Sequence, residues 1–303
     1  MTAHTHRTLR FLIVGVVVLL LFIGALAFGA TNYSLSYLWQ GFVDGAHQKV
    51  IVALYELRLS RNVAALLVGA ALGVSGCIMQ AVTRNPLADP GLLGLTAGAN
   101  AGLSLAIAFV PSLPFLGVMG ASFVGATIGA LLVLSISSSQ SIFKVILAGA
   151  AISALLMAIA DGIMLLFKTS QSITMWTAGG LIGVTWKEVQ LITPIILVTL
   201  VISLFLSKKV GLISMSNDVG IGLGLNIKRT KLILFLLTTL LTGAAVSLIG
   251  NMAFVGLIVP HMARFLIGTN YRYQLPMAAL VGAGILLLAD TLSRSINPPF
   301  EIP

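Results

Sequence analysis

Long stretches without a charged side chain dominate this sequence. The longest runs from Pro90 to Phe143, and another separates Lys231 from Arg264. An α-helix satisfies its backbone hydrogen bonds internally, and about 20 apolar residues are enough to cross the hydrocarbon core of a bilayer. The chain is 58% hydrophobic and only 8% charged, whereas soluble domains are about 25% charged. The sequence therefore predicts an all-α, polytopic membrane protein, with residues 1–303 forming a single transmembrane domain.

Prolines, glycines and charged residues divide these apolar runs into helices. Pro111 and Pro114 divide the run after Pro90, and Gly250-Asn251 divides the run after Lys231, because each run is too long for one crossing. The apolar run nearest the amino terminus, Phe11 to Ala30, is too long for the core of a signal peptide, so it counts as a span. We expect nine spans, at about 11–30, 62–83, 91–110, 115–136, 144–167, 188–206, 232–250, 253–267 and 273–293.

Basic residues punctuate the apolar runs. This pattern is typical of loop charges that orient a membrane protein, so the net charge of +9 is not a sign of nucleic-acid binding. With a cytoplasmic amino terminus, 11 of the 17 lysines and arginines lie inside, namely Arg7, Arg10, Arg84, Lys144, Lys208, Lys209, Lys228, Arg229, Lys231, Arg264 and Arg272. The others, Lys49, Arg58, Arg61, Lys168, Lys187 and Arg294, lie outside. The positive-inside rule thus favours a cytoplasmic amino terminus.

The most polar interruption is Ser207 to Lys231, where two basic clusters flank small and polar residues. Such a stretch cannot cross hydrocarbon, so we expect a cytoplasmic loop. Asn217-Asp218 predicts the cap of a short helix from Val219 to Leu223, which Gly224 ends. Long ordered loops are often functional. We interpret this one as a contact site for a cytoplasmic partner, with a solvated connector as the alternative.

The chain carries no recognisable catalytic motif. It has no phosphate-binding G-x-x-x-x-G-K-[ST] loop, no H-E-x-x-H motif and no paired carboxylates at a plausible depth. The single Cys77 excludes an intrachain disulfide and a thiolate metal cluster. We therefore expect no cofactor, and an energy source in an ion gradient or a partner. Asp161 in the fifth span is a candidate proton site, and a packed helix contact through its small neighbours is the alternative.

Arginines gather at the predicted outer face. Arg58 and Arg61 share one face at the start of the second span, and Arg294 ends the ninth. Arginines at helix ends commonly snorkel, and Asp290 precedes Arg294 by four residues, which predicts a helical ion pair. Three exposed guanidiniums at this face would also suit the carboxylates of a docking protein.

Several motifs together indicate a family. They are Arg58-Leu-Ser-Arg61, Leu66-Leu-Val-Gly-Ala-Ala-Leu72, Ser75-Gly76, Gln80, Arg84-Asn-Pro-Leu-Ala-Asp-Pro90 with Leu93-Gly94, Phe254-Val-Gly-Leu-Ile-Val-Pro-His261 with Arg264, Leu275-Pro276, Ala289-Asp290, Arg294 and Glu301-Ile-Pro303. This succession, which covers residues 58–303, resembles the FecCD-type permease subunits of type II ABC importers for iron-siderophore complexes, haem and vitamin B12.

The resemblance implies ten helices per subunit, paired as a homodimer or heterodimer around a pathway in a bacterial cytoplasmic membrane. Cytoplasmic ATPase subunits and an extracytoplasmic binding protein would be the partners. Residues 212–226 match the family's coupling segment, and about 145–181 match its pathway lining. The implied ATPase contacts are Asp218, Val219, Gly220, Leu223, Gly224 and Leu225, and the implied docking residues are Arg58, Arg61 and Arg294.

Two departures from the family pattern stand out. Ser60 replaces the proline that usually separates the two arginines, and the tenth helix expected after Pro303 is absent, so we expect a truncated sequence. The favoured function is a permease subunit without its own ATPase site, in an ATP-driven importer for a ferric siderophore. A proton-coupled secondary transporter that uses Asp161 is the alternative, and a membrane enzyme is a distant third.

Overall fold

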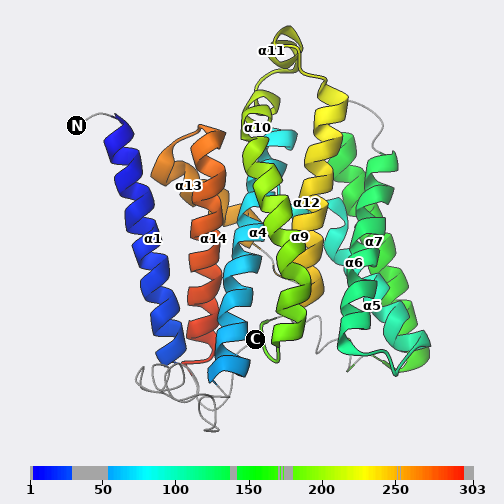
Figure 1. Ribbon diagram of the computed structural model, residues 1–303. Coiled ribbons are helices and arrows are strands. Elements are labelled where there is room, and N and C mark those ends of the chain that lie inside the picture. The colour runs from blue at the N-terminus through cyan, green and yellow to red at the C-terminus, as the bar shows by residue number, and fades with distance from the viewer. Residues whose placement is uncertain are drawn as a thin grey trace.

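The computed structural model describes residues 3–28, 54–136, 142–169, 171, 173, 180–250, 252 and 254–296. Every regular element in these ranges is helical, which confirms the expected all-α class. Figure 1 shows the long helices standing side by side as a bundle. The elements are α1 (Ala3–Ala27), η1 (Leu54–Leu59), α4 (Ser60–Thr83), η2 (Pro90–Leu93), α5 (Leu95–Phe109), α6 (Phe115–Ile136), α7 (Ile142–Phe167), α9 (Trp186–Phe205), α10 (Ser207–Ser214), α11 (Asn217–Gly222), α12 (Ile227–Ile249), α13 (Val255–Ile267) and α14 (Tyr271–Ser293).

Seven helical segments in the described chain are long and apolar enough to cross a membrane. They comprise α1, η1 with α4, α6, α7, α9, α12 and α14. The expected third and eighth spans correspond to α5 and α13, which have only 15 and 13 residues. At 1.5 Å per residue each is about 20 Å long, shorter than the ~30 Å hydrocarbon core. These two helices therefore lie within the bundle without spanning the full core on their own.

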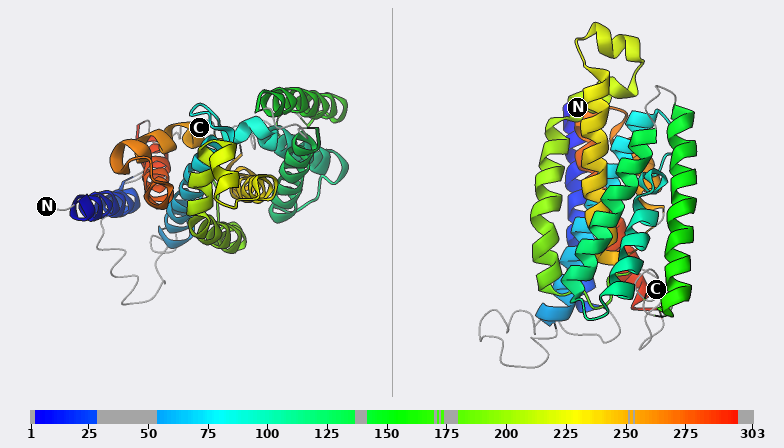
Figure 2. Two further views of the ribbon diagram at one scale, coloured as in Figure 1. Left: turned by 90° about the horizontal axis from the view of Figure 1, so that it is seen from above. Right: turned by 90° about the vertical axis from the view of Figure 1, so that its right-hand side faces the viewer.

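The helix α4 forms the centre of the bundle. It packs against α14, α12, α13 and α9, and 78% of the most apolar 18-residue stretch of Leu54–Thr83 is buried. By contrast, only 11% of the most apolar 18-residue stretch is buried in α1 and in α7, and Figure 2 shows these helices at opposite sides of the bundle. The helices α5, α6 and α7 pack together, and α12 connects this group to α4. Peripheral helices with apolar outer faces are what a lipid-facing bundle requires.

Small residues allow α4 and α14 to approach closely. Gly73 faces α14 so tightly that a Cβ atom added to it would lie 2.5 Å from the Ala278 carbonyl oxygen and 2.8 Å from Val259 Cγ1. Gly69 on the same face of α4 meets the backbone of Gly282 in the same way. Small residues at helix contacts let backbones come together where lipid gives no hydrophobic driving force. The contact therefore depends on the absence of side chains at these positions.

The expectation of a loop over residues 207–231 was wrong for most of that range. The chain forms α10 over Ser207–Ser214 and α11 over Asn217–Gly222, and α12 already begins at Ile227. Val210 and Ile213 of α10 are fully buried against α4 and α14. The burial of these two side chains stabilises α10, while Lys208 and Lys209 of the same helix remain exposed. An amphipathic helix therefore replaces the expected loop.

Candidate functional site

The short helix α11 projects beyond one end of the bundle, as Figure 1 and the right-hand view of Figure 2 show. Its cap is Ser216, whose side chain accepts a hydrogen bond from the Val219 amide at 3.3 Å, and not the expected Asn217-Asp218. The expected stop at Gly224 is present. This glycine has a φ of 78° and donates its amide to the Ile221 carbonyl at 2.9 Å. A left-handed residue after the last turn is a common helix ending.

Apolar side chains on α11 and just after it face solvent. Val219, Ile221 and Leu223 are 44%, 61% and 65% exposed. Clustered exposed apolar residues mark interaction sites more often than single ones do. The six expected ATPase contact residues fall into an exposed and a covered group. Gly220 is buried and Leu225 packs against the core, so these two are covered. The exposed ones are Asp218, Val219, Leu223 and Gly224. This end of the bundle thus presents a compact, partly apolar protrusion.

Arg84 attaches this protrusion to the bundle. It is the C-cap of α4 and has a φ of 50°, in the left-handed region. Its Nε donates to the Ile213 carbonyl at 3.0 Å, and its Nη2 donates to Asn217 Oδ1 at 2.5 Å. One side chain from the end of α4 therefore holds both the last turn of α10 and the first residue of α11. Sequence reasoning noticed Arg84 as part of a motif and as a cytoplasmic charge, and did not predict this link.

The three arginines at the opposite end are buried, so the expectation of exposed guanidiniums was wrong. Arg58, Arg61 and Arg294 are 9%, 8% and 3% exposed. Arg58 donates from Nη1 to the carbonyl oxygens of Leu26, at 2.9 Å, and Ala27, at 3.3 Å. Buried guanidiniums need such partners, because an uncompensated charge is costly away from water. Arg58 therefore ties η1, which directly precedes α4, to the end of α1.

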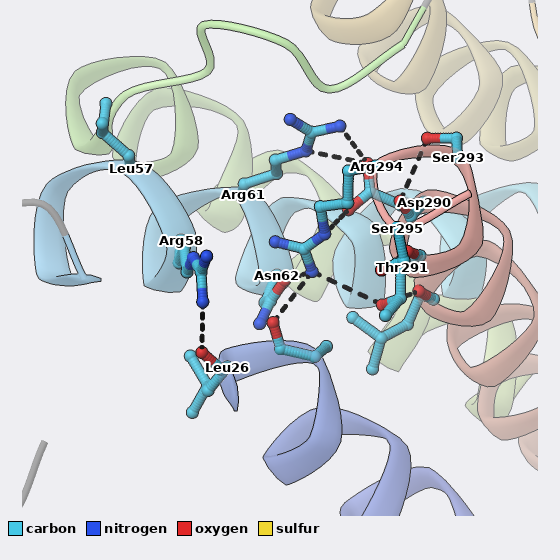
Figure 3. A network of polar contacts seen from close by, with 12 residues as sticks. Leu26, Leu57, Arg58, Arg61, Asn62, Asp290, Thr291, Ser293, Arg294 and Ser295 are labelled. Carbon is cyan, nitrogen blue, oxygen red and sulfur yellow. Dashed lines mark hydrogen bonds and ion pairs between the residues drawn. The ribbon is translucent and has the colours of Figure 1, made fainter. Parts of the chain in front are cut away.

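Arg61 and Arg294 share one carboxylate, as Figure 3 shows. Arg61 Nη2 lies 2.8 Å from Asp290 Oδ1, and Arg294 Nε lies 3.5 Å from Asp290 Oδ2. The second contact confirms the predicted ion pair within the helix. Arg294 Nη2 also donates to Asn62 Oδ1 at 2.8 Å and to the Ala25 carbonyl at 3.0 Å. We call Arg61, Asn62, Asp290 and Arg294 the outer arginine network, and it joins α1, α4 and α14. The sequence analysis predicted neither the contact of Arg61 with Asp290 nor the role of Asn62.

Asp161 lies on α7 with its side chain exposed. In the described part of the chain no residue forms an ion pair or hydrogen bond with its carboxylate. The helix itself is peripheral, with 11% of its most apolar window buried. Intramembrane proton sites normally face a bundle interior or a water-filled cavity. The expected packed contact through small neighbours is therefore not formed among the described residues, which leave the Asp161 side chain exposed.

The apolar bundle, with seven helical segments long enough to cross a membrane in its described part, defines a multi-pass membrane protein. The chain belongs to the FecCD transport family, whose sequence pattern matches residues 16–303. This result confirms the resemblance found in the sequence motifs.

Two similar proteins are permease proteins of an import system and of a transport system. The chain is 39% identical to the iron(3+)-hydroxamate import system permease protein FhuB of Bacillus subtilis (strain 168), over 100% of this chain and 80% of FhuB. It is 38% identical to the hemin transport system permease protein HmuU of Yersinia pestis, over 97% of this chain and 89% of HmuU. Among solved structures, a metal-chelate type ABC transporter in an inward-facing conformation superposes with a TM-score of 0.87 at 28% identity, covering 98% of this chain and 93% of the other.

Proposed function

We propose that this protein is the permease subunit of an ATP-driven importer for a ferric iron chelate, with a ferric siderophore as the favoured cargo. Membership of the FecCD transport family carries this proposal, supported by relatives named for iron(3+)-hydroxamate import and for hemin transport. The permease would form the translocation pathway and would have no ATPase site of its own. Transport of radiolabelled ferric hydroxamate and of haem into proteoliposomes that contain the permease and its ATPase, with matched binding proteins, tests the cargo.

The cytoplasmic ATPase subunits would dock at α11. The exposed Val219, Ile221 and Leu223 offer apolar contacts, and the hydrogen bond from Arg84 to Asn217 would transmit movement of α11 to the end of α4. ATP binding would draw the two ATPase subunits together, displace residues 212–226, and thereby tilt the attached helices. A short helix that a charge-assisted hydrogen bond attaches to the bundle can pass its displacement on to the attached helices, because its position is fixed relative to them.

The distribution of basic residues supports a cytoplasmic position for α11. Among the described side chains, the α11 end carries Arg7, Arg10, Arg84, Lys208, Lys209, Lys228, Arg229, Lys231, Arg264 and Arg272. The opposite end carries Arg58, Arg61, Lys168, Lys187 and Arg294. Cytoplasmic loops are enriched in lysine and arginine. We therefore place the α11 end and the amino terminus in the cytoplasm of a bacterial cell, with the outer arginine network on the outer side of its cytoplasmic membrane.

The docking of an extracytoplasmic binding protein at Arg58, Arg61 and Arg294 is part of the same proposal. Their burial adds a condition, since a carboxylate of the binding protein would have to compete with Asp290 for Arg61 and Arg294. Replacing Arg58 and Arg61 with glutamate should weaken binding-protein affinity at low salt. Lys187→Glu, an exposed site at the same end, is the control. Unchanged affinity in the arginine variant would remove these residues from the docking site.

A second permease subunit, identical or related, would complete the pathway next to α7. Leu155, Ile159, Leu165 and Leu166 leave a long exposed apolar face on this helix. That face suits a neighbouring subunit or lipid equally, so the dimer rests on the family and not on this surface. Cysteine crosslinking between two copies at Leu155 in membranes would test it, and absence of any crosslinked dimer along α7 would oppose it.

The decisive experiment is co-purification with the candidate ATPase. We expect Ile221→Asp to reduce retention of the ATPase at least tenfold, because it places a charge in an apolar contact, a change of about 1.4 kcal/mol or more. Ile182→Asp changes an equally exposed isoleucine at the opposite end and should leave retention unchanged. Replacement of residues 218–225 by a neutral linker should abolish it. If the ATPase is retained throughout, α11 is not the coupling element.

The secondary-carrier alternative has a separate test. Uptake that survives Asp161→Asn but stops without the ATPase would exclude it. Uptake that continues without any ATPase and fails in Asp161→Asn would instead overturn the importer proposal. The exposed position of Asp161 on a peripheral helix favours the first result.

A further inference from the structure

A cavity of about 830 Å³ opens at the α11 end, between α4, α10, α13 and α14. It is separate from the exposed face of α11, although Ser214 and Met215 at the junction of α10 and α11 contribute to its wall. The volume is within the range of small-molecule sites, which is about 300–1,000 Å³. Nothing in the proposed transport cycle requires a cavity at this position.

Four cationic side chains line this cavity, which are Arg84, Lys208, Arg264 and Arg272, and its described lining contains no aspartate or glutamate. A concave surface with one sign of charge concentrates the electrostatic potential and attracts counter-ions. Guanidiniums suit phosphate in particular, since their planar donors match two oxygens at once. Arg84 uses only Nε and Nη2 in its contacts to α10 and α11, which leaves further N–H groups on the same side chain.

The cavity also contains two buried glutamines, which makes it more than a charged surface. Gln80 and Gln274 are only 3% and 1% exposed. Arg264 Nη2 donates to Gln80 Oε1 at 3.4 Å, so the guanidinium and the amide are arranged together. Gln274 Nε2 donates to the Pro260 carbonyl at 3.4 Å, while its Oε1 has no hydrogen-bond partner. A buried acceptor without a donor costs about 1–3 kcal/mol, and a ligand hydroxyl would supply that donor.

The amino-terminal end of α14 lies at the same cavity. Asn270 and Tyr271 belong to its lining, and Asn270 caps the helix by accepting from the Arg272 amide at 3.1 Å. The positive end of a helix dipole favours an anion nearby. It thus adds to the cationic side chains, which favour the same anion, whereas the unpaired Gln274 oxygen favours a hydrogen-bond donor.

We propose that this cavity binds a phosphate ester that carries a free hydroxyl group, the chemistry of a glycerophosphate. The phosphate would contact Arg264, Arg272 and Lys208, and the hydroxyl would donate to Gln274 Oε1. Two sources offer this chemistry at the cytoplasmic face, which are the headgroup of phosphatidylglycerol and soluble glycerol phosphate. The site lies beside the Arg84 contact to Asn217, so its occupancy would influence how firmly α11 is held.

Binding to the detergent-purified full chain tests the proposal without any transport assay. Native mass spectrometry would count bound phosphatidylglycerol against phosphatidylcholine, and calorimetry would measure glycerol 1-phosphate. The variant K208A/R272A removes one lysine and one arginine from the cavity. Its matched control, K228A/R229A, removes the same charges from exposed positions on α12 at the same end. All four residues are exposed, so folding should be preserved, and thermal unfolding verifies it.

We expect the cavity variant to bind at least tenfold more weakly, with the control within about twofold of the parent chain. Binding of the lipid alone identifies a headgroup site, whereas binding of glycerol 1-phosphate identifies a soluble ligand. Equal losses in the two variants would show a general attraction of the basic surface and would overturn the proposal. Failure of the parent chain to bind either probe would overturn it as well. Because neither probe involves the ATPase, these results are independent of the proposed transport function.

Discussion

The guanidinium of Arg61 lies 2.8 Å from the carboxylate of Asp290, although 229 residues separate the two in the sequence. Both side chains are buried, and Arg294 approaches the same carboxylate from one helical turn further along. The contact fixes the start of α4 against the end of α14, at the face where a binding protein is proposed to dock. The arginines at this face are therefore part of the folded framework before any partner arrives.

Loss of the Asp290 charge should be strongly destabilising. Asp290→Asn leaves two buried guanidiniums without their counter-ion, and breaking a buried pair in this way costs about 3–5 kcal/mol. Thermal unfolding in detergent should show a clear fall in Tm. Asp161→Asn makes the same chemical change at an exposed site on α7 and should leave Tm unchanged. Equal Tm values for Asp290→Asn and the parent chain would show that the network does not stabilise the fold.

Arg84 and Asn217 should be energetically coupled in holding α11. Arg84→Ala removes the contacts to both Ile213 and Asn217, so hydrogen exchange across residues 217–222 should accelerate. A double-mutant cycle with Asn217→Ala should give a coupling energy of about 1 kcal/mol, since the bond is charge-assisted but exposed. Arg229→Ala, an exposed arginine on α12, is the control. Additive effects would mean that the two side chains act separately.

Gly73 should not tolerate a larger side chain. A Cβ atom at this position would lie 2.5 Å from the backbone oxygen of Ala278, and backbone cannot move aside as a flexible side chain can. Gly73→Leu should separate α4 from α14 and lower the free energy of unfolding by about 1–3 kcal/mol or more. Gly120→Leu is the matched control, because no heavy atom lies within 4 Å of its added Cβ. Similar Tm values for the two variants would contradict the close contact.

Asp89, in the segment between α4 and α5, should make stability depend on pH. Burial raises the pKa of this carboxyl, and the hydrogen bond from the Gly91 amide only partly opposes the rise. The folded state therefore holds this proton more tightly than the unfolded state, so its stabilising effect is present below the unfolded pKa and is lost as pH rises through the folded pKa.

The variant Asp89→Asn keeps an oxygen for Gly91 but cannot ionise. Its Tm relative to the parent chain should increase as pH rises from about 4 towards neutrality, and the two should converge below the ordinary aspartate pKa of about 3.9. Unfolding scans across this range measure the difference. A Tm difference that does not change with pH would show that the carboxyl titrates alike in both states.

Much of the fold follows from local sequence pattern. The helix α6, Phe115–Ile136, has the expected bounds of 115–136 and begins directly after Pro114, and α12 ends at Ile249, just before the expected break at Gly250. The position of α11 was also predictable, because Gly224 supplies a left-handed helix end. Hydrophobic length and helix-ending residues act over a few neighbouring positions, so they can be read directly from the chain.

Helix α10 and the outer arginines could not be predicted in the same way. Lys208 and Lys209 indicated a loop, but Val210 and Ile213 are covered by α4 and α14, which lie far away in the sequence. Arg61 was expected to face solvent at a helix end, and it instead meets a carboxylate that only the packing of α14 brings near. In both cases the deciding interaction comes from a distant segment, and local pattern carries no information about it.

The sequence by itself determined that the chain is an apolar helical bundle, where most helices begin and end, which end is rich in basic residues, and the family to which it belongs. These properties depend on composition and on near neighbours along the chain. Only the tertiary structure decided that Asp290 neutralises Arg61, that Arg84 holds α11, and that four cationic side chains share one cavity with two buried glutamines. Each of these depends on distances between helices, which close packing sets once the bundle has formed.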